Sequence, residues 1–224
     1  MTNKPVISIL GGTGAQGSAL ALRWVNAGYS VVIGSRNAQK AAKACEEISR
    51  QVEKANISHD NYAAAADKGE VVVLCVPYAS QRETVESVRE ALEGKILIDA
   101  TVPLVPPKVA RVQLPEGGSA VAAIQAMLGD SVKVVSAFQN VAAHVLSELS
   151  SPVECDVLVC GNDVDARETV IKLAGDIGMR AIHAGPIGNS AAAEALTSIL
   201  ISINSRYKVS GAGVRITRLD TDKK

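Results

Sequence analysis

Short apolar runs alternate along the first half of the chain with longer, more polar stretches. The runs at 5–10, 29–34, 70–77 and 95–100 show no alternation of apolar and polar positions, which is typical of parallel strands covered on both faces. The stretches between them, at 15–28, 37–54, 61–69 and 79–92, predict crossover helices, the third of them only a short helix or turn. Asn37 is placed to cap the second helix. The pattern predicts an α/β fold built on a parallel sheet.

The same pattern resumes after a proline-rich connection at 101–118. It predicts strands at 132–137, 156–161 and 179–184, and helices at 119–128, 139–149, 163–176 and 189–207. A short last strand is expected at 211–218, and the tail 219–224 is expected to be solvated.

Composition narrows the classes of partner. The 224 residues carry a net charge of zero and only six aromatic side chains, so neither nucleic acid nor a membrane surface is expected to bind. The four cysteines form no C-x-x-C pair, and Cys75, Cys155 and Cys160 lie in or beside apolar runs, which predicts buried thiols. With no signal peptide and no apolar run of transmembrane length, a reduced, cytoplasmic protein is expected.

A glycine-rich turn joins the first strand to the first helix. Gly12, Gly14 and Gly17 satisfy G-x-G-x-x-G in a strand–turn–helix frame, although an ordinary glycine-rich loop has the same composition. In the dinucleotide-binding motif the first glycine makes the turn, the second admits the pyrophosphate and the third packs the helix closely. The prediction is a Rossmann-type doubly wound sheet. Its dinucleotide-binding domain covers 1–138, and a smaller C-terminal α/β part covers 139–224.

The end of the second strand indicates which dinucleotide binds. An acid there would bind the ribose hydroxyl of NAD, but this chain has Ser35 and Arg36, with Lys40 one helical turn further on. A guanidinium can pair bidentately with a 2′-phosphate, which an acid would repel. NADP(H) is therefore predicted over NAD(H), the alternative being that Arg36 and Lys40 are solvated residues of the helix start.

Two later strands end near the same edge of the predicted sheet. Residues Val76, Pro77 and Tyr78 follow one strand and 100–102 follow the next, so both should border the cofactor. Tyr78 has surface packing as an equal alternative. Asp99 is a candidate acid, but an aspartate at a strand end more often caps the next turn.

Several stretches together resemble one family. They are ILGGTGAQG, VVIGSR, LCVP with Tyr78, TVPLVP, KVVSAFQNVAAH, DVLVCGND and AGPIGNSAAAEALTSILISIN. In these the chain resembles the NADPH-dependent reductases of the deazaflavin coenzyme F(420). It departs from that family at Gln139, where members often carry histidine, and at Val141, where isoleucine is common.

The resemblance implies an oxidoreductase that transfers a hydride between NADP(H) and coenzyme F(420), the latter as co-substrate. No protein nucleophile or metal is required, because the two rings carry the chemistry. The resemblance also implies residue roles. Thr13, Ala15 and Gln16, beside the turn glycines, would contact the pyrophosphate, and Ser35, Arg36 and Lys40 would contact the 2′-phosphate. Val76, Pro77, Tyr78 and Val102 would contact the ribose and nicotinamide, and Val141, Ala142 and Ala143 would position the rings.

Small residues also crowd the last third of the chain. Gly185 and Pro186 are expected to let a flat ring approach the backbone. Hydroxyacid dehydrogenases of similar layout carry a catalytic lysine where Glu194 stands, so a carbonyl reductase is less expected. Two alternatives remain: an NADPH-dependent reductase of an imine, quinone, flavin or metal complex, and a non-catalytic NADPH-binding module. The apolar helix at 190–204 favours a homodimer.

Overall fold

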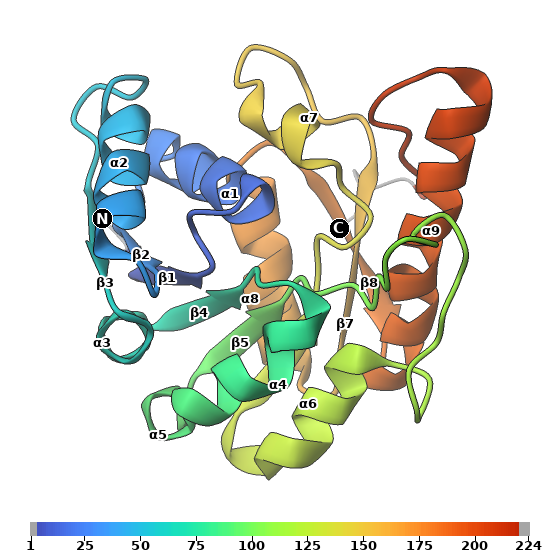
Figure 1. Cartoon of the computed structure of the whole chain (residues 1–224), viewed down its shortest axis with the longest axis horizontal. Helices are drawn as coiled ribbons and strands as arrows, with labels where there is room; N and C mark the ends of the chain where they lie inside the picture. The colour runs from blue at the N-terminus through green and yellow to red at the C-terminus, as the bar shows by residue number, and fades with distance from the viewer. Residues whose placement is uncertain (1–3, 220–224) are drawn as a thin grey trace.

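A single eight-stranded sheet forms the centre of the computed structural model, which describes residues 4–219 (Figure 1). The strand order is β3-β2-β1-β4-β5-β6-β7-β8, and every neighbouring pair is parallel except β6–β7. The strands are β1 (Ile7–Leu10), β2 (Val31–Gly34), β3 (Ile57–Asp60), β4 (Val71–Leu74), β5 (Ile96–Asp99), β6 (Lys133–Ser136), β7 (Asp156–Gly161) and β8 (Arg180–Gly185). The first six have the order of a doubly wound dinucleotide fold, as predicted.

Helices cover both faces of the sheet, and two apolar clusters form the core between the layers. On one face lie α1 (Ala15–Asn26), α2 (Ala38–Ser49), α7 (Ala143–Ser147) and α8 (Val164–Gly175). On the other lie α3 (Tyr62–Lys68), α4 (Tyr78–Ser87), α5 (Arg89–Leu92) and α6 (Ala120–Leu128), with α9 (Ser190–Tyr207) packed against α6. Strands β1, β2 and β4 are buried at every position, which explains why their sequences do not alternate.

The order of the strands reverses between β1 and β4, and this fixes where a ligand can bind. β1 pairs with β2 on one side and with β4 on the other, and the connections from their carboxyl ends leave in opposite directions. In such sheets the crevice outside these carboxyl ends is the binding position. The glycine turn follows β1 at this point.

The C-terminal part continues the same sheet. β7 joins β6 antiparallel, with Ser136 opposite Cys160, and β8 runs parallel to β7. Helix α1 reaches across to this part. The Trp24 indole nitrogen donates to Leu173 O at 3.0 Å, and the buried Arg23 guanidinium donates to five carbonyls, including those of Leu146 and Ile177.

Four predictions about the elements were wrong. β3 was not predicted, because it is a short edge strand with exposed side chains at its centre. The last strand expected at 211–218 does not form, since Asp156 and Arg180 hold this segment through Val214 and Ile216 without a ladder. The helix expected at 139–149 is limited to α7, and the one expected at 79–92 is divided into α4 and α5 at Val88.

Two further expectations have a mixed outcome. Cys160 is buried as predicted, but Cys75 and Cys155 are only partly buried. Of the tail expected to be solvated, Leu219 is exposed and residues 220–224 lie outside the described residues. Between residues 4 and 219, the structure contains no helix that is long and apolar enough to cross a membrane.

Candidate functional site

The turn after β1 depends on four glycines rather than three. Gly11, which the motif does not include, has a φ of +85°, and a Cβ on it would lie 2.4 Å from Cys75 O. Gly11 therefore makes the tight turn that the sequence assigned to Gly12, whose own φ is not positive. Gly17 packs as predicted, since a Cβ there would lie 2.6 Å from Gly11 O. The neighbouring glycine in G-G-T-G was the available signal for Gly11.

The turn presents open backbone to an anion. A Cβ on Gly14 would meet only Gly11 O at 3.3 Å, and Gly14 is exposed, so nothing in the fold fills the space beside it. The first helical bond of α1 runs from Ser18 N to Gly14 O. The amides of Ala15, Gln16 and Gly17 therefore have no acceptor within the helix, and no acid lies in its first turn. This arrangement suits a pyrophosphate.

Cations follow the end of β2, as the sequence predicted. The side chain of Ser35 is buried and its oxygen accepts from Asn37 N at 3.1 Å. Asn37 caps α2 by accepting from Lys40 N at 2.9 Å, which confirms its predicted role. Arg36 and Lys40 are exposed, and neither forms a salt bridge within residues 4–219. Two unpaired cations thus stand beside the turn that would hold the dinucleotide.

At the end of β5, Asp99 organises two neighbouring segments. One carboxylate oxygen accepts from Thr101 N at 2.9 Å and the other from the Gln81 amide of α4 at 2.6 Å. This is the capping role that the sequence favoured. The side chain is fully buried, and burial raises the pKa of Asp99 to about 6, although the Thr101 and Gln81 bonds favour the charged form. Asp99 thereby ties α4 and the 100–102 segment to the sheet.

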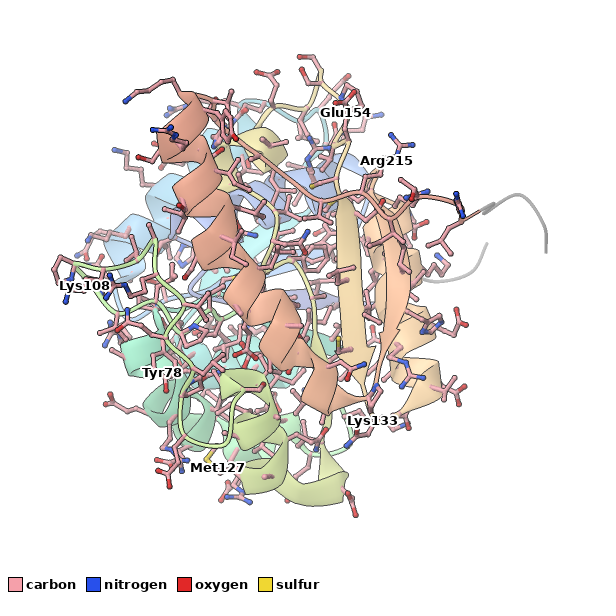
Figure 2. All side chains as sticks on the ribbon, turned by 90° about the vertical axis from the view of Figure 1, so that its right-hand side faces the viewer. Tyr78, Lys108, Met127, Lys133, Glu154 and Arg215 are labelled. Atoms are coloured by element: carbon pink, nitrogen blue, oxygen red, sulfur yellow. The ribbon has the colours of Figure 1, made fainter. Side chains whose placement is uncertain are left out.

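A cleft of about 570 Å³ lies between α4 and α6, and residues 115–117 also line it. Tyr78, half-buried at the start of α4, lines it together with Gln81 and Ala120. Figure 2 shows Tyr78 on the side of the molecule that α9 and α6 border. β4 and β5 are parallel neighbours, so the predicted residues that follow them lie at one edge of the sheet. Of these, Val76 is buried, Pro77 is exposed and Val102 is half-buried.

The segment between β6 and α7 is held from several directions. Its residue Phe138 has a φ of +72°, and its buried ring meets Trp24 edge-on at 5.8 Å. The side-chain amide nitrogen of Gln139 donates to Asp99 O at 2.7 Å and to Ser136 Oγ at 2.8 Å. The backbone carbonyl of Gln139 accepts from the Thr197 hydroxyl of α9 at 2.8 Å. These bonds bring Val141, Ala142 and Ala143 to the same edge as the glycine turn.

Unused hydrogen-bonding groups gather at this edge. Thr101 Oγ1, Gln139 Oε1 and Asn140 Oδ1 are buried and have no partner among the described residues. Buried polar atoms are seldom left unpaired, so such a group of atoms points to a polar ligand or to bound water. The fold thus offers open backbone amides, free cations and unpaired polar atoms along one edge, which fits a phosphorylated dinucleotide with an amide-bearing ring.

Comparison with known proteins agrees with this geometry. Residues 6–103 match a family described as NADP oxidoreductase, coenzyme F(420)-dependent. The chain is 45% identical over 223 residues to the F(420)-dependent NADP reductase of Methanocaldococcus jannaschii, covering 96% of this chain and 99% of the relative. It is 41% identical to that of Methanothermobacter thermautotrophicus, with 95% of each covered. The chain belongs to the F(420)-dependent NADP reductase family.

Solved structures carry the same fold, the first described as an F(420)-dependent NADP reductase and the second as an imine reductase. A crystal structure from an Arthrobacter species covers 95% of this chain with a TM-score of 0.77 at 26% identity. An imine reductase from Myxococcus stipitatus has a TM-score of 0.64 at 16% identity, which shows a shared fold alone. A rat metalloreductase is 28% identical over 192 residues, but the chain spans only 36% of its length.

In this chain, Glu194 has a structural role: it holds the start of α6. It is buried on α9, and its carboxylate accepts from Ala120 N at 2.8 Å, Val121 N at 3.2 Å and Ser119 Oγ at 2.7 Å. It therefore caps α6 from a helix far along the chain. The sequence showed only that no lysine stands here, because its partners lie more than 70 residues away.

Two predicted residues, Gly185 and Pro186, lie where β8 ends. Gly185 pairs with Cys160 of β7, which pairs with Ser136, the last residue of β6, so Gly185 lies level with the carboxyl ends of β5 and β6. Because β8 runs opposite to β6, the chain after Gly185 continues toward the amino ends of these strands. Ile187 N binds Asn162 just after β7, and Asp163 pairs at 3.1 Å with Lys133, the first residue of β6. Gly185 has a φ of +98° that a turn toward α9 requires. The small size of Gly185 serves this turn, and the role of Gly185 and Pro186 beside a flat ring stays a prediction.

Proposed function

We propose that the protein transfers a hydride between NADP(H) and coenzyme F(420). The observation that carries this proposal is the identity of 45% along nearly the whole length of a relative named for that activity, in a chain whose fold offers a matching dinucleotide edge. The two cofactors supply the hydride donor and acceptor. The protein's part is to bind them, orient them and exclude water.

The dinucleotide is proposed to lie across the carboxyl ends of β1, β2 and β4. The open turn at Thr13, Gly14 and Ala15 and the free amides of α1 would hold the pyrophosphate. Arg36 and Lys40 would pair with the 2′-phosphate, and the buried Ser35 would orient the same loop. The remaining proposed contacts, to the ribose and nicotinamide, are Val76, Pro77, Tyr78 and Val102.

The ring side is proposed to be formed by the segment after β6. Hydride transfer needs the reacting atoms about 3–3.5 Å apart, which requires small side chains and a fixed backbone. Val141, Ala142 and Ala143 offer both, since the preceding residues are bonded to α1, β5 and α9. We also propose 1–138 as the dinucleotide-binding part and 139–224 as the part that completes the deazaflavin side.

Mixing the protein with NADPH and coenzyme F(420) tests the function. The deazaflavin's visible absorbance should bleach while NADPH is oxidised, in equal molar amounts. The matched control omits the deazaflavin and leaves NADPH unchanged. If NADPH binds by calorimetry and no bleaching is seen, the proposed acceptor is wrong.

Other acceptors have less support. The imine reductase neighbours share 16–18% identity, which extends to the fold and not to a substrate. The metalloreductase relatives align to about a third of their length. A panel of an imine, a quinone, a flavin and a ferric chelate in the same assay would reveal such an activity. If NADPH is oxidised neither by coenzyme F(420) nor by any acceptor of the panel, only the non-catalytic binding module remains.

A homodimer is proposed through α9. Ile199, Ile203 and Tyr207 lie four residues apart on one face of this helix and are 47%, 37% and 71% exposed. Figure 2 shows α9 along the front of the molecule with no other helix over it. Replacing Ile199 and Ile203 with lysine should halve the mass measured by light scattering, whereas Val164→Lys on α8, 57% exposed, should not. A wild-type monomer would refute the proposal.

A cytoplasmic location is also proposed. Its support is that all four cysteines are free, as in proteins of a reducing compartment. Cell fractionation of the native host with an antibody to this chain would test it, and recovery outside the cytoplasm would overturn it.

A further inference from the structure

Gln16 has an unusual position for a residue of a phosphate-binding turn. It is the second residue of α1, beside the open amides, and its side chain is half-buried. Instead of facing the open turn, its amide nitrogen donates at 3.2 Å to Phe138 O, 122 residues along the chain. The turn that would hold the dinucleotide is thus bonded directly to the segment that leads to the ring side.

The residue that accepts the hydrogen bond from Gln16, Phe138, has a strained backbone. Phe138 is a non-glycine residue with a φ of +72°, a conformation that costs about 1–3 kcal/mol and persists only where the surroundings fix it. Its buried ring is fixed against Trp24 of the same helix α1. Its carbonyl accepts from Gln16 and also from Val141 N at 3.3 Å. Strain of this kind is concentrated at functional sites, where it sets geometry.

The orientation of the Phe138 carbonyl determines the path of residues 141–143. Val141 bonds to that carbonyl, Ala142 is the residue before α7, and Ala143 begins the helix. These are the three residues proposed to position the rings. A rotation of the 138–139 peptide would therefore move all three together.

We propose that Gln16 is a positioning residue, which fixes the 138–143 segment for hydride transfer and couples it to an occupied glycine turn. The proposal rests on the proposed function for its kinetic readout. It differs from the role that the family resemblance implies, in which the side chain contacts the pyrophosphate. A phosphate ligand would change dinucleotide affinity, whereas a positioning residue changes the rate of transfer from a cofactor that is still bound.

The test compares Gln16→Leu and Gln16→Asn with the wild-type enzyme. Leucine keeps the size and removes the donor, while asparagine keeps an amide that is one methylene too short to reach Phe138 O. For both we expect a Kd for NADPH within about twofold of wild type and a kcat about tenfold lower, because a small misplacement of the reacting rings is costly. Ser18→Ala, whose hydroxyl bonds only within α1, is the matched control and should change neither.

Two readouts do not depend on turnover. Amide hydrogen exchange in the 138–146 peptide should rise about tenfold in both variants, because the Phe138 carbonyl loses a partner. Trp24 is the single tryptophan of the chain and touches Phe138, so its emission reports on this segment. Oxidised NADP should shift that emission in the wild type, and the shift should be lost in the variants.

The outcomes separate the two roles. A tenfold rise in Kd with kcat unchanged would make Gln16 a phosphate ligand and overturn the proposal, as would unchanged kcat, exchange and emission. If the wild type proves inactive with coenzyme F(420), the proposed function fails by itself, and exchange and emission still decide whether Gln16 holds the segment. If leucine unfolds the chain, the asparagine variant provides the same measurements.

Discussion

At the scale of single residues, Arg36 is the side chain that we propose selects NADP(H) over NAD(H). It is exposed and unpaired among the described residues, so an added phosphate can bind it without breaking an existing ion pair. A hydrogen bond to a charged group contributes about 1.5–3 kcal/mol, so Arg36→Leu should weaken NADPH binding about 10–100-fold and leave NADH binding unchanged. Titration calorimetry with both dinucleotides measures this. Arg50→Leu, an exposed arginine at the end of α2, is the control, and an unaltered preference in Arg36→Leu would contradict the assignment.

Asp99 is the residue whose titration should be visible in stability. Its folded pKa of about 6 lies above the ordinary 3.8, so between these values the folded state binds more protons than the unfolded state. The contribution of Asp99 to the free energy of unfolding therefore falls as the pH rises from about 4 to 6. Asp99→Asn removes this fall while Gln81 can turn its amide to donate or accept.

Relative to the wild type, the Asp99→Asn variant should thus gain on the order of 2–3 kcal/mol between pH 4 and pH 7. Urea unfolding at several pH values measures the difference, and Asp67→Asn on the surface of α3 corrects for the change in charge. Two stability curves that stay parallel over this range would show that the Asp99 carboxyl is not desolvated.

At the scale of elements, Glu194 joins α9 to α6. Removing its carboxylate in Glu194→Ala leaves the first amides of α6 buried without acceptors, which should cost about 2–4 kcal/mol. Glu194→Gln keeps one acceptor and should cost about half as much. Thermal unfolding measures both, with Glu83→Ala on the exposed face of α4 as control. A Glu194→Ala variant as stable as the wild type would show that the cap contributes nothing.

The elements also show what the sequence could predict. Strands β1, β2 and β4 and the helices between them were predicted because burial on both faces leaves unbroken apolar runs. β3 carries polar residues at an edge, so its sequence lacks that signal. Residues 139–142 were wrongly predicted as helix, because their conformation depends on bonds from Gln139 to Asp99 and Thr197, which lie 40 and 58 residues away. No local pattern records such bonds.

At the scale of the whole molecule, the two functional parts share one core. Phe138 and Leu146 belong to the same apolar cluster as Ile9, Trp24 and Val170, and the sheet is continuous through β6 and β7. Arg23 of α1 donates to five carbonyls of the later part and is itself buried. Cutting the chain at 138 would expose this cluster and leave a buried guanidinium without acceptors, which costs several kcal/mol.

The chain should therefore unfold as one unit, although its two parts have different proposed tasks. Trp24 fluorescence, which senses the α1–α8 contact, and circular dichroism, which senses all helices, should give the same urea midpoint. A fragment of residues 1–138 should remain unfolded by circular dichroism because its core lacks α7 and α8. Distinct midpoints, or a folded fragment that still binds NADPH, would instead make the dinucleotide part an independent domain to which the deazaflavin part was attached.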